Sequence, residues 1–347
     1  MNKLSAGIRR TGLGLFAGAA MAFAAPYAAA NDAARDAATT PYAPIHVPVQ
    51  VQHVPDSNVY YVLGLAAVPG QDNEGFTSNA GFVVTNDGVV VYDTLGTPSL
   101  GYALLKKIRE VTDQPIKYVI VGHYHADHIY GLQAFKDHTD AVIIAQAKAS
   151  EYFHGSQAGL QQGPAQIRLQ QRREALAPWV DDNTRVVKPD VTFEQQLDIR
   201  LGDTRLSLSY VGPAHSPSDV MMMVHPANVL FAGDIMQNKR IPVMFGSEVD
   251  TGNWLKGLEK VLDMQPRFVI GGHGTPADDP TAAVKFTHDY IEYLQTTMSD
   301  AVDNWVDFEQ AYAQTDWSQY EDLPAFEEAN KKNAYRTYLN MEQQQFE

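Results

Sequence analysis

Residues 121–128, with the sequence Val-Gly-His-Tyr-His-Ala-Asp-His, decide how the rest of this 347-residue chain is interpreted. They follow the apolar run 117–121, which predicts a buried strand, so three imidazoles and a carboxylate meet where the chain leaves a sheet. In an extended segment His123 and His125 point the same way and can share one metal ion, whereas Asp127 and His128 begin a helical turn and face a second position. Since chance gives this spacing in about one in a thousand chains of this length, it indicates a metal site.

Three later segments supply the same types of donor in the same kind of place. Each carries a histidine or an aspartate just past an apolar run, with a glycine nearby that admits close approach of the backbone. The segments are Val211–His215, Phe231–Asp234 and Ile270–Gly274, and the donors are His215, Asp234 and His273. Because the chain contains no cysteine, any metal must be bound by nitrogen and oxygen, a combination that suits zinc.

The apolar pattern around these segments predicts a layered α/β fold. Short β-branched or aromatic runs at 47–53, 58–64, 81–85 and 89–92 predict an antiparallel meander, with a hairpin turn at Asp87-Gly88. Residues 66–79 are too many and too polar for a tight turn and form a candidate active-site flap. Helical spacing at 100–111 and 254–262 alternates with apolar runs at 117–121, 141–144, 206–211, 220–224, 229–231 and 268–270. Two β-rich halves with helices outside them are typical of a layered α/β arrangement.

Two stretches fall outside this alternation. Residues 146–180 are polar and rich in glutamine, and we interpret them as a helical insertion. Residues 281–347 predict a C-terminal helical extension, in which Val284, Ile291, Met298 and Trp305 share one face of a first helix and a second helix spans about 323–339. We interpret this extension as serving packing or self-association rather than chemistry, so its helices are the candidate interface of a homo-oligomer.

The N-terminus has the composition of a signal peptide, residues 1–30. It carries Lys3, Arg9 and Arg10 and no acidic residue, then an apolar stretch too short to remain as a membrane helix, then small residues at Ala28–Ala30 where cleavage is expected. The paired arginines leave twin-arginine export and ordinary secretion both open. Residues 31–45 are expected to form a flexible lead-in.

The predicted location is therefore periplasmic or secreted, without stable membrane insertion. Removing three positive charges from a chain of net charge −15 gives −18 for the mature protein. Such a field repels phosphate backbones, so nucleic acid is excluded as a partner and a small-molecule substrate is expected.

The donors, in this order, resemble those of the metallo-β-lactamase superfamily, and Asn79-Ala80-Gly81 and Tyr92-Asp93-Thr94 extend the resemblance over about residues 50–280. It implies a four-layer αββα sandwich in residues 46–280. One zinc ion would then take His123, His125 and His215, and the other would take Asp127, His128 and His273, with Asp234 bridging both. Asp93 is a candidate for orienting a ligand imidazole, although a simple turn-forming role explains it equally well.

The implied function is that of an exported dinuclear zinc hydrolase. A hydroxide that bridges the metals would attack an ester, thioester, lactone or amide-type bond, and Asp127 would orient it and pass a proton to the leaving group. Many antibiotic-degrading members carry Cys where this chain has Asp234, and a substrate-binding Lys where it has Gln237. Lys239 and Arg240 lie nearby, but we interpret them as solvated surface residues rather than anion ligands.

A bridging aspartate is similar to thioester, lactone and phosphoester hydrolases. The export signal, residues 215–219 and the helical tail resemble the periplasmic metallohydrolases associated with quinoprotein dehydrogenases and sulfur oxidation. One alternative is a persulfide dioxygenase-like oxidoreductase with a single iron, and another is a non-catalytic metal-binding partner of a periplasmic dehydrogenase. A complete second set of donors disfavours both, and the substrate, the metal loaded in the cell and the oligomeric state stay open.

Overall fold

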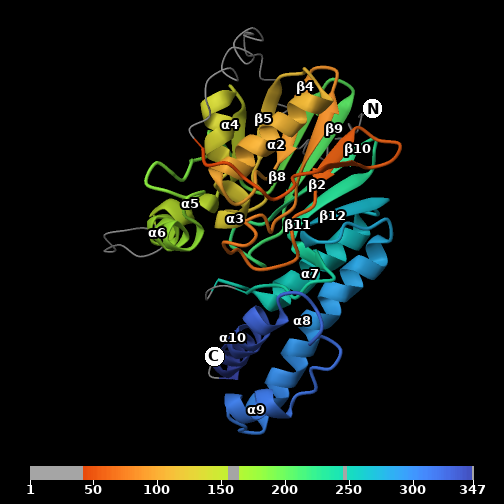
Figure 1. The fold of residues 1–347 in the computed structure, drawn as a ribbon. Coiled ribbons are helices and arrows are strands. Elements are labelled where there is room, and N and C mark those ends of the chain that lie inside the picture. Colours follow the sequence, from red (N-terminus) through yellow and green to blue (C-terminus); the bar gives the residue numbers. More distant parts are fainter. Residues whose placement is uncertain (1–41, 155–163, 245–247, 346–347) are drawn as a thin grey trace, which may run out of the picture.

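The computed structural model of this protein describes residues 42–154, 164–244 and 248–345 (Figure 1). The predicted signal peptide and most of the predicted lead-in lie outside these ranges. Within them, none of the helices combines the length and the apolar character that a membrane span requires.

Seven strands form the first sheet, in the order in which they occur along the chain. They are β1 (Val51–His53), β2 (Val59–Val62), β3 (Ala80–Thr85), β4 (Gly88–Tyr92), β5 (Ile116–Ile120), β6 (Val142–Gln146) and β7 (Val191–Phe193). The first four pair antiparallel, as the predicted meander requires, and β4 to β7 pair parallel. Because the carboxyl ends of β4 and β5 lie at the same edge of the sheet, the segment after β4 and the 121–128 loop after β5 open side by side.

Helices join these parallel strands and cover the outer face of the sheet (Figure 1). α2 (Pro98–Val111), between β4 and β5, and α4 (Leu132–His138), between β5 and β6, lie over this face. The short α3 (Ala126–Ile129) precedes α4 at the edge of the sheet where the 121–128 loop opens. Helix α2 starts sharply, because the Thr97 side chain accepts a hydrogen bond from the Leu100 N–H and Pro98 occupies the first turn.

Five strands form the second sheet, in the order β12-β11-β10-β9-β8. They are β8 (Gln196–Leu201), β9 (Thr204–Tyr210), β10 (Val220–His225), β11 (Val229–Asn238) and β12 (Phe268–Gly274), and α7 (Thr251–Asp263) connects the last two. The donors Asp234 and His273 both follow the predicted apolar runs, and β12 ends at Gly274, next to His273, as expected. The prediction that the segment Phe231–Asp234 ends a strand was wrong, because β11 continues to Asn238. The pairing continues through two register shifts around Gly233, whose φ of +55° suits glycine.

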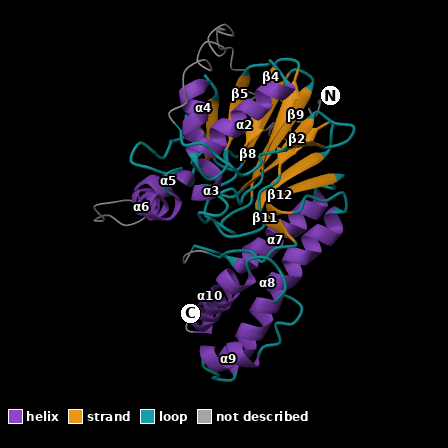
Figure 2. Cartoon of the chain, viewed as in Figure 1, coloured by secondary structure: helices purple, strands orange, loops and turns teal. Residues whose placement is uncertain are grey.

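Three apolar cores hold the layers together. One joins α2 and α4 to the first sheet and includes Leu104, and a second, which includes Phe231, fills the space between the sheets. The third joins the second sheet to α7 and the C-terminal helices and includes Trp254 and Ile291. The order helix, sheet, sheet, helix is the predicted αββα sandwich (Figure 2).

The described residues of the predicted insertion and of the tail are largely helical, as expected. The insertion contains α5 (Ala149–His154) and α6 (Pro164–Leu176), and the tail consists of α8 (Pro280–Asp303), α9 (Phe308–Gln314) and α10 (Phe326–Gln345). The prediction that Trp305 shares the buried face of the first tail helix was wrong. The helix ends at Asp303, and the chain turns through a φ of +59° at Trp305, which leaves its side chain 85% exposed.

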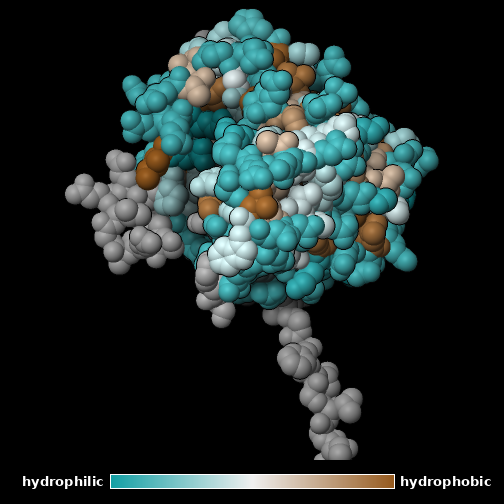
Figure 3. All heavy atoms as spheres, turned by 90° about the horizontal axis from the view of Figure 1, so that it is seen from below, coloured by the Kyte–Doolittle hydropathy of each residue, from teal (hydrophilic) through white to brown (hydrophobic). Residues whose placement is uncertain are grey.

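Seen from below, the protein presents a largely hydrophilic surface, on which hydrophobic residues are scattered rather than gathered into one broad patch (Figure 3).

Candidate metal centre

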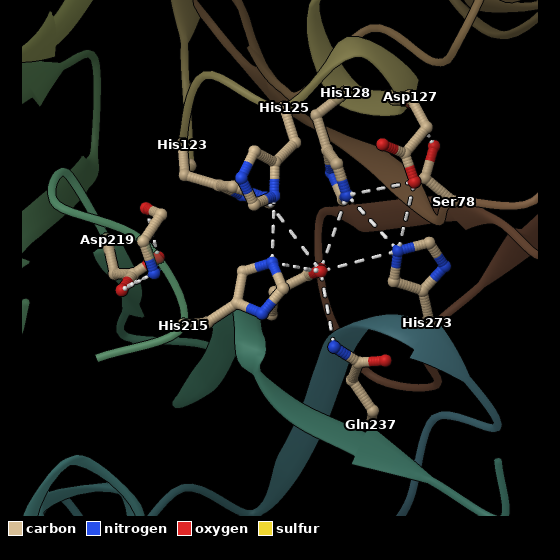
Figure 4. A network of polar contacts seen from close by, with 12 residues as sticks. Ser78, His123, His125, Asp127, His128, His215, Asp219, Gln237 and His273 are labelled. Carbon is tan, nitrogen blue, oxygen red and sulfur yellow. Dashed lines mark hydrogen bonds and ion pairs between the residues drawn. The ribbon is translucent and has the colours of Figure 1, made fainter. Parts of the chain in front are cut away.

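Five histidines and two aspartates converge at the edge where the two sheets open. They are His123 and His125 from the loop after β5, Asp127 and His128 from α3, His215 from the loop after β9, Asp234 from β11 and His273 from β12. The imidazoles turn toward one another (Figure 4). The structure therefore brings together all seven donors predicted from the sequence, although they come from five separate elements and loops.

The first group of donors consists of His123, His125 and His215. One nitrogen from each lies within 4.8 Å of the others, and Nδ1 of His125 is 2.9 Å from Nε2 of His215. This is the set that the family resemblance assigns to one ion.

The second group consists of Asp127, His128 and His273, again with one donor atom from each within 4.8 Å. Nε2 of His273 is 3.3 Å from Nε2 of His128 and 3.3 Å from Oδ2 of Asp127. This set matches the donors that the family resemblance assigns to the second ion.

Asp234 lies between the two groups. Its Oδ2 is 3.1 Å from Nε2 of His215 and 3.4 Å from Nε2 of His273, and its Oδ1 is 3.3 Å from Nε2 of His128. Glycine is needed opposite this carboxylate, since a Cβ on Gly272 would lie 1.9 Å from Asp234 Oδ1. The Asp234 carboxylate is therefore in contact with donors of both groups.

The donor set fits a divalent cation. Both ring nitrogens of His123 are buried and have no hydrogen-bond partner among the described residues, which is costly unless a cation satisfies one of them. Burial lowers the pKa of His123 well below its ordinary value, that of His125 to about 3 and that of His215 to about 4, so these imidazoles are in the neutral, ligating form at neutral pH. Nitrogen and carboxylate oxygen suit zinc.

The carboxylates remain charged in spite of their burial. Burial opposes ionisation of Asp127 and Asp234, but contacts with His273 and His128 outweigh it and hold the pKa of each carboxyl well below its usual range. Burial opposes protonation of His128 and His273, but the nearby carboxylates, Asp234 first, outweigh it and raise the pKa of each imidazole, so a dication that binds here displaces their protons.

Neighbouring groups fix the orientation of two ligand imidazoles. Nδ1 of His128 is 2.9 Å from Oδ2 of Asp93, whose Oδ1 accepts a hydrogen bond from the Gly122 N–H. The contact expected of Asp93 with a candidate ligand imidazole is therefore present. Nδ1 of His273 is 2.8 Å from the carbonyl oxygen of Thr77 in the predicted flap. Such partners set the tautomer and the ring orientation of a ligand.

The sequence did not reveal other supporting contacts. Ser78 Oγ donates to the Asp127 carbonyl, and Asn79 Nδ2 donates to the carbonyls of Gly271 and Gly274, which fastens the flap to both sides of the centre. Asn79 belonged to the family resemblance, but its partners lie about 190 positions away, and no local pattern encodes such a contact.

The His215 loop is braced by Asp219 and Trp254. Asp219 accepts hydrogen bonds from the N–H and Oγ of Ser216, and burial raises the pKa of its carboxyl to about 7. The Trp254 ring meets the His215 ring edge-on at 5.1 Å. The run 215–219 resembles a side-chain-capped turn, and this was the signal that could have identified Asp219.

A pocket opens in front of the donors. Besides five of them, its lining includes Val68 and Pro69 from the flap, Arg172 from α6, and Gln237, Arg240 and Val243 from β11 and the loop that follows it. A second pocket, which includes Tyr124, Lys148 and Ser218, shares His125 with the first. The two pockets therefore meet at His125.

The interpretation of Arg240 as a solvated surface residue was wrong, because its side chain is only 2% exposed. Lys239 is exposed and has a φ of +58°, so the two neighbouring side chains diverge and Arg240 turns inward. Nη1 of Arg240 donates to Gln237 Oε1 at 2.7 Å, and Nη2 donates to the Ala67 carbonyl at 3.0 Å. Its Nε is buried without a hydrogen-bond partner among the described residues. Gln237 in turn donates to Asp234 (Figure 4).

Comparison with known proteins agrees with this centre. Residues 73–273 match the family model described as "Metallo-beta-lactamase superfamily". The linear primary-alkylsulfatase of Pseudomonas sp. (strain ATCC 19151) is 21% identical over 234 residues, which cover 60% of this chain and 44% of that protein. The metallo-beta-lactamase type 2 of Bacillus sp. (strain 170) is 20% identical over 216 residues, 60% of this chain and 70% of that protein. The chain thus spans less than half the length of the alkylsulfatase.

Two solved structures share the fold. A metallo-beta-lactamase from Pontibacter korlensis has a TM-score of 0.52 at 17% identity, covering 71% of this chain and 99% of its own. The inverting sec-alkylsulfatase Pisa1 from Pseudomonas sp. has a TM-score of 0.62 at 17% identity, covering 84% of this chain and 50% of its own. The curated relatives are hydrolases, and the family model covers more than half of this sequence. The chain belongs to the metallo-beta-lactamase superfamily.

Proposed function

We propose that this protein is a dinuclear zinc hydrolase that cleaves an ester-type bond in a small anionic substrate. The observation that carries this proposal is the pair of three-donor groups, each within 4.8 Å, that meet at Asp234. When bound, two zinc ions would supply an acidified water and positive charge opposite the bond under attack.

The side chains around the centre perform the remaining tasks. Asp127 borders the pocket with its side chain 15% exposed, so its carboxylate can orient the attacking water and pass a proton to the leaving group. The buried Arg240 guanidinium keeps one N–H unused beside the donors, which suits an anionic group of the substrate. Arg172 adds a second positive charge to the lining of the same pocket.

These charges favour sulfate and phosphate esters among the candidate substrates. Thioesters, lactones and amide-type bonds with a neighbouring carboxylate fit the same arrangement, because the guanidinium recognises the anion and not the bond that breaks. One relative is named as an alkylsulfatase and another as a beta-lactamase, so both types belong in the test.

Export to the periplasm or the medium is part of the proposal. Its support is the basic, then apolar, then small-residue composition of residues 1–30. The lack of cysteine is compatible with an oxidising compartment. Membership of the subgroup associated with quinoprotein dehydrogenases and sulfur oxidation, and self-association through the C-terminal helices, are further parts of this proposal.

The test is a panel of β-lactam, lactone, thioester, phosphoester and sulfate-ester substrates offered to zinc-loaded protein. We expect turnover of at least one anionic member, abolished by Asp127→Asn and retained by Asp322→Asn, a matched change at an exposed position of the tail. Hydrolysis that Asp127→Asn abolishes would exclude a non-catalytic metal-binding role. One iron per chain together with oxygen uptake would replace the hydrolase by the dioxygenase alternative.

A further inference from the structure

The loop after β11 forms one wall of the metal pocket, and we call its residues 240–244 the Arg240 loop. Arg240 and Val243 line the pocket, while Ile241 and Met244 are buried in the core that β11 shares with the C-terminal helices. The loop therefore has one side toward the metal donors and the other toward the tail.

Asn333, on α10, holds this loop by two hydrogen bonds. Its Nδ2 donates to the Pro242 carbonyl at 2.6 Å, and its Oδ1 accepts from the Met244 N–H at 3.0 Å. The side chain amide thereby satisfies a backbone acceptor and a backbone donor two residues apart, as a neighbouring strand would. A third bond joins the Ile241 N–H to the carbonyl of Pro324, just before α10.

Buried partners fix the Asn333 side chain itself, which is fully buried. Its Nδ2 also lies 2.9 Å from the hydroxyl oxygen of Tyr290 on α8. The Tyr290 hydroxyl in turn donates a hydrogen bond to Oδ1 of Asn330, one turn before Asn333 on α10. A buried amide is costly unless its groups are paired, so this network has one well-defined arrangement.

The tail also reaches the strand that carries the donors. The Gln237 N–H donates to Oγ1 of Thr287, a fully buried residue of α8. Gln237 is the residue that contacts both Arg240 and Asp234, so α8 and α10 hold the two ends of the segment from Gln237 to Met244.

We propose that the C-terminal helices position the Arg240 loop for binding the anionic group of the substrate, with Asn333 as the positioning residue. The tail thus serves the site, and not packing or self-association alone. This inference rests on the proposed function only in the identity of the ligand, since the contacts that hold the loop do not depend on turnover.

Asn333→Leu tests the proposal, because leucine keeps the volume of the side chain and removes both bonds to the loop. Asn330→Leu is the matched control: it removes an equally buried amide from the same helix, and among the described residues the Asn330 side chain bonds Tyr290 and Tyr312 rather than the loop. Both variants lose a buried amide, so a general loss of stability affects both. Thr287→Val, which removes only the acceptor for Gln237, is a milder third variant if Asn333→Leu fails to fold.

Two readouts on zinc-loaded protein separate the outcomes. For Asn333→Leu we expect faster deuterium uptake by residues 240–244 and about 10-fold weaker binding of inorganic sulfate, with less than about 3-fold weakening for Asn330→Leu. Thr287→Val should shift both readouts in the same direction by a smaller amount.

Equal uptake and equal sulfate affinity in the Asn333 and Asn330 variants would overturn the positioning role. If wild-type protein binds no sulfate, the anion-binding part of the inference fails, and the uptake comparison still decides whether Asn333 orders the loop. Hydrolysis of an anionic panel substrate by Asn333→Leu, with unchanged loop exchange and unchanged sulfate affinity, would leave the proposed reaction intact and sink this inference alone.

Discussion

The metal donors and the Arg240 loop border the same pocket, but the chain holds them in different ways. The donors are fixed by contacts inside the sandwich, such as Asp93 on His128 and the Thr77 carbonyl on His273. The Arg240 loop depends on Asn333 and Pro324 in the tail. Metal binding and anion binding should therefore be separable by mutation, although the two sites share Gln237.

The largest effect is expected from Asp234→Ala, which removes the one donor that contacts both groups. Catalytic efficiency should fall by about 10³-fold or more, because the charge that stabilises the transition state is lost with the metal. Steady-state kinetics with the best substrate of the panel measures this loss. Full activity in Asp234→Ala would mean that this carboxylate is not a ligand.

Arg240→Met should lower kcat/KM for an anionic substrate by about 100-fold, since a hydrogen bond to a charged group contributes about 1.5–3 kcal/mol. Methionine retains much of the apolar stem, and Lys239→Met is the exposed control, expected to change kcat/KM by less than about 2-fold. Neutral and anionic substrates of the same bond type should be compared. An equal loss on both would show that Arg240 acts on stability or metal binding and not on the anion.

Asp93→Asn tests whether metal binding can be weakened without a change in anion binding. Loss of the carboxylate that orients His128 should weaken zinc binding by about 10–100-fold in a chelator competition. At saturating zinc, sulfate affinity should stay close to that of the wild type. A large change in sulfate affinity at full metal occupancy would contradict the separation of the two sites.

The smallest expected effect is a change in the pH dependence of the melting temperature, and it concerns Asp219. Burial raises the pKa of its carboxyl to about 7, so the folded state disfavours the charged form, and this costs stability increasingly as pH rises from about 4 to about 7. Asp219→Asn removes that titration and should flatten the fall in melting temperature over this window relative to wild type. Parallel melting curves against pH for the two proteins would show that the Asp219 carboxyl stays ionised in the folded state.

The fold and the donors could be predicted because their signals are local. The apolar runs marked most strands of both sheets, and the 121–128 loop carried four donors in eight residues. The edge strands β7 and β8 were not predicted, because β7 has only three residues and β8 is largely exposed, with polar Gln196, Asp198 and Arg200 in place of a continuous apolar run.

The substrate wall could not be predicted, because it depends on contacts between distant parts of the chain. Lys239 and Arg240 are adjacent basic residues, and only the backbone turn at Lys239 sends one outward and the other into the pocket. Asn333 lies about 90 positions from the loop that it holds, on a helix whose sequence is largely polar. No periodicity distinguishes such an asparagine from a solvated one.

The most direct test of the account is to locate the metals by anomalous X-ray scattering at the zinc edge in crystals of zinc-loaded protein. We expect two peaks about 3.5–4 Å apart. One should lie among His123, His125 and His215, the other among Asp127, His128 and His273, with Asp234 between them. A single peak, or peaks away from these residues, would contradict the dinuclear centre on which the proposed hydrolysis depends.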